Sequence, residues 1–259
     1  MAWIETESLA GGVRSIALAH GKVNTLHREL MEEFRARLRE AVADPEVRAI
    51  LVSGRNGNFS AGLDFKRLMA ARMAGPEEGA AFGEAVRGGV LDLWTCPKPT
   101  VAAVTGHSIA AGFMVALACD FRYVTKGPGE YGFNELAFGA GFPALTMAQV
   151  HFVLGWHGRK VMYGSRLYDW EEGMRNGSFD EAFESPEATW DAAQKHAAYL
   201  GSMPKEAYAN VKEQLQAPFL KIVAEETAED RARREEIYSS EESMAAMMRH
   251  VQRFMGGGS

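Results

Sequence analysis

The chain has 259 residues, of which 47% are hydrophobic, and its formal net charge at pH 7 is -6. Because no Pro/Ser/Gly-rich linker divides this length, we expect one core with a helical C-terminal extension. No run of Lys or Arg forms a phosphate-binding stripe, which argues against a nucleic-acid partner. No apolar stretch is long enough to span a bilayer, and the N-terminus lacks a signal-peptide pattern, so we expect a cytoplasmic protein.

The cysteines and histidines indicate neither a disulfide framework nor a metal site. Cys96 and Cys119 are the only two cysteines, and both lie in apolar or strand-like stretches. They are predicted to be small core residues in a reducing compartment. No spacing of cysteines and histidines resembles a set of metal ligands, so no metal is predicted.

The N-terminal half of the chain alternates strand-like and helix-like stretches. Predicted strands cover residues 3–8, 13–19, 47–53, 100–104 and 120–125. Predicted helices begin after an N-cap at Thr25 and at Asp64, and they also cover residues 77–93 and 110–118. Strand, helix, strand, helix in this order predicts an α/β fold with parallel pairing and right-handed crossovers.

From about Ala144 onward the pattern is almost wholly helical. Residues 215–237 are charged and amphipathic, and residues 240–254 are predicted to form a last helix. That helix carries a stripe of methionines, Met244, Met247 and Met248. Such a stripe is typical of a core or a subunit interface rather than of a ligand site.

Two loops of small residues follow predicted strands and each opens a helix. The first lies in the stretch 57–65, and the second lies in the stretch 99–112, after the strand that this stretch contains. The first N–H groups of a helix have no intrahelical partner, and the helix dipole favours negative charge there. Two such loops after neighbouring strands predict a site for an anion or a developing oxyanion.

At these residues the chain resembles the crotonase superfamily of enoyl-CoA hydratases and isomerases. Residues 59–64 resemble the first family signature, residues 103–120 the second, and residues 23–26 the early Asn-x-Leu element. The resemblance implies a crotonase-like ββα spiral core over residues 1–195 and a helical region over residues 196–259. It further implies an acyl-CoA thioester substrate, and packing of the helical region between subunits in a homotrimer or hexamer.

The resemblance also assigns roles to single residues. It implies that the backbone N–H groups of Leu63 and Ala111 form an oxyanion hole for the thioester carbonyl. The family usually has three glycines where this chain has Ala110, Ala111 and Gly112, so the substrate is expected to approach a tighter backbone. The expected substrate or CoA contacts are Ser60, Ala61, Gly62, Asp64, Lys66, Ala110, Gly112 and Met114.

Some of these contacts have a second interpretation. Lys66 and its neighbour Arg67 would either reach a phosphate of CoA or remain solvated surface cations. Asp64 would cap the helix that it precedes, with a polar role near the pocket as the alternative.

The carboxylates distinguish one reaction from another. Hydratases of this family use two glutamates, and the resemblance puts Met114 at the first position and Glu135 at the second. Addition of water needs a deprotonated water on one side and a proton on the other, whereas moving a double bond needs one base. Glu135 is therefore expected to be the catalytic base of a Δ3,Δ2-enoyl-CoA isomerase, with no cofactor besides the CoA of the substrate.

Alternatives remain at this stage. Glu135 would be a surface carboxylate at a strand end if the resemblance did not extend to it. The reaction could also be a hydration, a thioester hydrolysis or a decarboxylation, and the thioester could sit on a carrier protein. The chain could instead bind acyl-CoA without catalysis.

Overall fold

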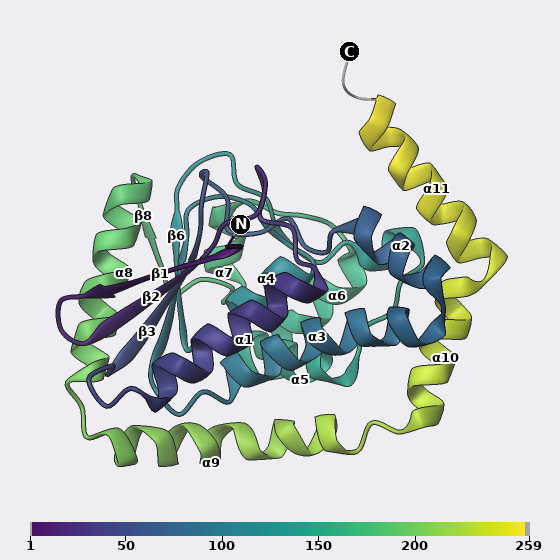
Figure 1. Ribbon diagram of the computed structural model, residues 1–259. Helices are drawn as coiled ribbons and strands as arrows, with labels where there is room; N and C mark the ends of the chain where they lie inside the picture. Colours follow the sequence, from purple (N-terminus) through teal and green to yellow (C-terminus); the bar gives the residue numbers. More distant parts are fainter. Residues whose placement is uncertain (1, 257–259) are drawn as a thin grey trace.

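A six-stranded sheet organises the computed structural model, which describes residues 2–256 (Figure 1). Its strand order is β1 (Ile4–Leu9), β2 (Val13–Leu18), β3 (Ala49–Gly54), β4 (Thr100–Val104), β6 (Phe121–Thr125) and β8 (Glu181–Phe183). β1 pairs antiparallel with β2, and every later pair is parallel. A second, two-stranded sheet pairs β5 (Ser108–Ile109) with β7 (Tyr131–Gly132) in parallel.

Helices cover both faces of the large sheet. They are α1 (Arg28–Ala43), α2 (Phe65–Ala74), α3 (Pro76–Trp94), α4 (Ala111–Leu117), α5 (Ala144–Leu154), α6 (Gly158–Gly164), α7 (Trp170–Arg175), α8 (Pro186–Gly201), α9 (Lys205–Ala224), α10 (Ala228–Ser239) and α11 (Glu241–Gly256), with 3-10 helices η1 (Glu135–Phe138) and η2 (Gly155–His157). Figure 1 shows α8 on one side of the sheet and α1, α3 and α5 on the other.

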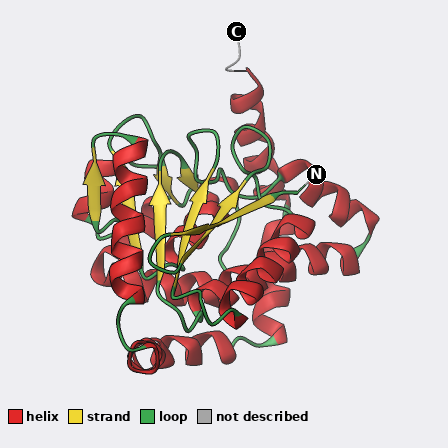
Figure 2. Cartoon of the chain, turned by 60° about the vertical axis from the view of Figure 1, so that its left-hand side comes forward, coloured by secondary structure: helices red, strands yellow, loops and turns green. Residues whose placement is uncertain are grey.

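The buried strands explain why the sheet is parallel. Every residue of β4 is buried, and so are the first five residues of β3. Strands buried on both faces are typical of parallel sheets, whose crossover helices cover both sides. The main strands point toward the end of the molecule where the long loops gather (Figure 2). The predicted α/β fold with parallel pairing is therefore confirmed, and open α/β sheets place ligands at this edge.

The prediction that Thr25 caps the first helix is wrong. α1 begins two residues later, with His27 as its N-cap. Leu26 is extended because its N–H donates to Gly62 O at 2.7 Å and its carbonyl accepts from Asp64 N at 2.8 Å. A residue held in a strand-like bridge cannot also belong to the first turn of a helix, so α1 starts after it.

The predicted, almost wholly helical stretch from about Ala144 onward is confirmed within the described residues, with β8 as its exception. This three-residue strand pairs with β6 and is too short to show an alternating pattern of its own. The stretch 215–237 is also divided, because Thr227 and Asp230 form a capping box that starts α10. The proposed boundary between residues 195 and 196 lies inside α8, so the division into two regions remains a prediction.

Both cysteines are buried and unpaired, as predicted for small core residues. Within residues 2–256, no helix is long and apolar enough to cross a membrane. In the same part of the chain, no three His, Cys, Asp or Glu side chains gather as a metal ion would require.

Candidate functional site

Backbone hydrogen bonds join the two small-residue loops to each other. The N–H groups of Phe59 and Ser60 both donate to His107 O at 3.0 Å, and Ile109 N donates to Ser60 O at 3.0 Å. A Cβ added to Gly62 would lie 3.0 Å from Ile109 O, so the first loop passes directly against the residues that precede α4. The loops after β3 and β4 therefore form one rigid unit at the carboxyl edge of the sheet.

This unit presents two free backbone donors. Among the described residues, neither Leu63 N nor Ala111 N donates a hydrogen bond within the chain. The neighbouring groups are engaged, because Ala61 N donates to Val23 O and Gly62 N donates to Ser60 Oγ. An unpaired N–H beside a buried helix start is suited to an oxyanion.

Of the three positions where the family usually has glycines, two carry alanine in this chain and one, Gly112, keeps the glycine. A Cβ at Gly112 would clash with Ser60, so only glycine fits there. Ala110 has φ 53° and ψ -125°, a conformation that L residues rarely adopt, and its N–H donates to Gly132 O at 2.9 Å. Strain of this kind costs about 1–3 kcal/mol and is commonly found at functional sites.

The short β5–β7 sheet brings Glu135 to this unit. Gly132 ends β7 and accepts from Ala110, so the segment that follows β7 lies beside the start of α4. η1 begins three residues later with Glu135 itself. Ser165 Oγ accepts from Ala137 N at 2.9 Å and fixes this turn.

Apolar surroundings change the acidity of Glu135. The side chain is half-buried, and the segment around it carries Phe133, whose ring contacts Phe113 and Phe142 with centroids 5.1 and 5.3 Å apart. Burial raises the pKa of Glu135 to about 7, although its Oε2 accepts from Asn134 N at 2.9 Å, which opposes the rise. A carboxyl with a pKa near neutrality is suited to proton transfer.

Met114 lies on α4 one turn after Ala111 and is buried. Its Sδ accepts a hydrogen bond from Thr146 Oγ1 of α5 at 3.3 Å. A thioether has no proton to exchange in the physiological range, and it accepts hydrogen bonds weakly. Sequence reasoning missed Thr146, because nothing in its local pattern relates it to a residue 32 positions earlier.

Other predicted contacts are used inside the protein. Ser60 is buried, and its Oγ donates to Asn24 O at 2.8 Å. The Asn24 amide in turn donates to Arg55 O and Asn58 O, so these polar groups shape the loop. We therefore assign Ser60 to positioning of the loop, and its hydroxyl is not free for CoA.

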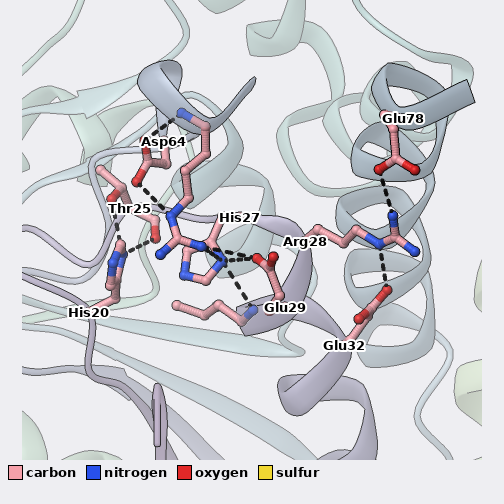
Figure 3. Close-up of polar contacts among 10 residues, drawn as sticks. His20, Thr25, His27, Arg28, Glu29, Glu32, Asp64 and Glu78 are labelled. Atoms are coloured by element: carbon pink, nitrogen blue, oxygen red, sulfur yellow. Dashed lines mark hydrogen bonds and ion pairs between the residues drawn. The ribbon is translucent and has the colours of Figure 1, made fainter. Parts of the chain in front are cut away.

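A polar cluster behind Leu63 fixes the start of α2. Figure 3 shows His20, Thr25, His27, Glu29 and Asp64 gathered there. Asp64 Oδ1 accepts from Arg67 N at 3.0 Å, and the predicted helix cap is thereby confirmed.

Arg67 and Lys66 lie in different environments. Arg67 Nη1 lies 3.1 Å from Glu29 Oε2 and 3.3 Å from His27 Nδ1. Burial lowers the pKa of His27, and the charge of Arg67 adds to this effect. Arg67 is therefore committed to this cluster. Lys66 is exposed and makes no ion pair with the described residues.

The comparisons with known proteins agree with this geometry. The enoyl-CoA hydratase/isomerase family profile matches residues 8–255. A probable enoyl-CoA hydratase of Mycolicibacterium paratuberculosis is 30% identical over 231 residues, covering 88% of each chain. A peroxisomal enoyl-CoA delta isomerase 1 of Arabidopsis thaliana is 29% identical over 174 residues, covering 66% of this chain and 71% of that protein.

Solved structures show the same fold. The human mitochondrial delta3-delta2-enoyl-CoA isomerase superposes with a TM-score of 0.90 at 22% identity, covering 99% of this chain and 100% of that one. The Pseudomonas aeruginosa protein PA4980 superposes with a TM-score of 0.74 at 27% identity, covering 91% and 98%. The expected crotonase-like core with a helical C-terminal extension is confirmed.

Relief of strain at Ala110 should stabilise the fold. Ala110→Gly is expected to raise the free energy of unfolding by about 1 kcal/mol, because relief of strain exceeds the added entropy of glycine. Gly155 has nearly the same backbone conformation, φ 49° and ψ -124°, with open space around it. Gly155→Ala should therefore destabilise by a similar amount. Urea unfolding measures both variants, and a less stable Ala110→Gly would contradict the strain.

The stability of the fold should depend on the ionisation of Glu135. Its folded pKa of about 7 exceeds the ordinary 4.5, so the protonated form favours the folded state. That contribution is complete below about pH 4.5 and is lost as the pH rises through about 7. The free energy of unfolding of Glu135→Gln should therefore exceed that of wild type by a margin that grows from about pH 4.5 to about pH 7. This margin should reach about 3 kcal/mol. Urea unfolding at several pH values measures this gain, and a difference that is independent of pH would argue against a buried carboxyl.

Proposed function

The chain belongs to the enoyl-CoA hydratase/isomerase family and is an acyl-CoA-processing enzyme, and we propose that it converts a 3-enoyl-CoA into a 2-enoyl-CoA. One observation carries this proposal: burial raises the pKa of Glu135 to about 7, while Met114, which the resemblance puts at the position of a hydratase's other carboxylate, is a buried thioether. One titratable group suffices to move a double bond, whereas hydration needs two.

In the proposed mechanism Glu135 removes a proton from C2 of the acyl chain. The electron pair of the broken C–H bond delocalises into the thioester, which leaves a dienolate with its negative charge on the carbonyl oxygen. The same carboxyl then gives the proton to C4, and the double bond lies between C2 and C3. The step is redox-neutral, so it requires no cofactor beyond the CoA of the substrate.

The backbone donors stabilise the charged intermediate in this proposal. Leu63 N and Ala111 N are assigned to the thioester oxygen, because both are free within the described chain. Removal of one donor from such a site typically costs about 2.7–4 kcal/mol in the transition state. We assign to the packed rings of Phe113, Phe133 and Phe142 the role of limiting the access of water, which would strengthen both interactions.

Lys66 and the C-terminal helices supply the remaining parts of the proposal. Lys66 is exposed near the start of α2, where it would pair with a phosphate of CoA.

Met244 and Met248 of α11 are 39% and 64% exposed, and we assign them to contacts between subunits of a homotrimer or hexamer. Met247 on the same helix is instead buried within the chain.

Loss of the carboxylate should abolish catalysis. Glu135→Gln is expected to lower kcat on a 3-enoyl-CoA by about 10²–10⁴-fold, because the amide cannot accept the C2 proton. Formation of the conjugated product is followed by its ultraviolet absorbance. Glu213→Gln is the matched control, because Glu213 is an exposed residue of α9 outside the proposed site. Full activity of Glu135→Gln would refute the mechanism, and faster hydration of a 2-enoyl-CoA by wild type would favour a hydratase.

The contribution of Lys66 should appear in substrate binding. Lys66→Ala is expected to raise KM several-fold and leave kcat nearly unchanged, because a phosphate contact is made equally in the ground and transition states. Lys205→Ala serves as the control, since Lys205 is exposed at the start of α9. An unchanged KM, measured at low ionic strength, would show that Lys66 remains a solvated cation.

A further inference from the structure

Helix α2 begins two residues after Leu63, and little of its surface is buried in the core. It has no buried residue, and Leu68 and Ala71 are its half-buried contacts with the core. Phe65 is 41% exposed and Met73 is 85% exposed. Because burial of apolar surface is the main stabilising term in folding, an element with so little of it opens at low free energy. Besides the packing of α2 on α3, polar contacts at its two ends therefore help to define where α2 lies.

The N-terminal end of α2 is attached to α1. Asp64 caps the helix, and Arg67 forms an ion pair with Glu29 and a contact with His27. The bridge between Leu26 and Leu63 lies between these two helix starts. These contacts fix the first turn of α2. The C-terminal end of α2 is held by other contacts.

The C-terminal end of α2 is attached to the C-terminal helices of the chain. Arg72 Nη2 lies 3.2 Å from Glu235 Oε2, and the Arg72 guanidinium lies 3.9 Å above the ring of Tyr238. Both partners belong to α10, which runs beside the end of α2 in Figure 1. The Tyr238 hydroxyl donates to Met247 Sδ of α11 at 3.8 Å. A planar guanidinium can satisfy an ion pair and a stacking contact together, and lysine cannot replace it in both.

The same pair of helices also contacts the turn that carries Glu135. Gly139 ends η1 with φ 79°, and a Cβ added there would clash with Ser243 of α11. Ser243 is buried at this contact. α10 therefore contacts the helix that follows the Leu63 donor, and α11 contacts the turn that carries Glu135. Residues 63 and 135 are far apart in sequence, but this pair of helices supports the segments of both.

We infer that Arg72 is a positioning residue, which ties α10 to α2 and so, through the contact of α11 with Gly139, fixes Glu135 relative to the Leu63 N–H. This inference rests on the proposed function, because it assigns Leu63 to the thioester oxygen. A small displacement of a donor weakens an oxyanion contact more than it weakens binding of the whole substrate. Loss of Arg72 should then act on kcat more than on KM.

The test compares Arg72→Met, Tyr238→Leu and Tyr238→Phe at a temperature where all three are folded. Arg72→Met and Tyr238→Leu are expected to lower kcat roughly tenfold with a smaller change in KM, since a cation–π contact and an exposed ion pair are together worth about 1–2 kcal/mol. Tyr238→Phe keeps the ring and should restore kcat. Glu184→Gln, which removes the surface ion pair with Lys126, is the control.

A measurement without substrate separates this inference from the proposed function. Amide hydrogen exchange of residues 65–74 should be roughly tenfold faster in Arg72→Met than in wild type or Glu184→Gln. Wild-type exchange in Arg72→Met, or faster exchange with an unchanged kcat, would overturn the inference. If wild type does not turn over a 3-enoyl-CoA at all, the proposed function fails, and the exchange rates alone decide whether Arg72 holds α2.

Discussion

The structure depends on one set of backbone hydrogen bonds, those that join the loop after β3 to the loop after β4. Phe59, Ser60 and Ile109 exchange these bonds with their neighbours across the loops, and Gly112 leaves room for Ser60. Main-chain bonds of this kind leave little freedom, so the free N–H groups of Leu63 and Ala111 are held in advance. In our proposal the reaction needs this preorganisation more than it needs any particular side chain on the loops.

The acidity of Glu135 follows from a second constraint, the position of η1 after the short β5–β7 sheet. Burial of the carboxyl raises its pKa to about 7, and Phe133, two residues earlier, packs its ring against Phe113. Met114 is buried, and its thioether accepts from Thr146. In our proposal the site combines a base of suitable strength with an anion-stabilising loop, and the C-terminal helices contact both the end of α2 and the turn that carries Glu135.

Much of this could be predicted from sequence where the signal is local. The buried strands, the cap at Asp64 and the two small-residue loops follow from residue types at short spacing, and the resemblance to known enzymes indicated Glu135. Features that depend on distant partners could not be predicted. Thr25 does not cap α1 because Leu26 pairs with the first loop, β8 becomes a strand through its pairing with β6, and Arg72 has its ion-pair partner on α10.

The central claim is that one carboxyl with a raised pKa performs the proton transfer. Its most direct test is the pH dependence of kcat/KM for conversion of a 3-enoyl-CoA by the wild-type chain. Only the ionised form of Glu135 accepts the C2 proton, so kcat/KM should rise as the pH increases through about 7 and then level off. A rate constant that stays unchanged between about pH 5 and 8, or that falls across this range, would contradict the account.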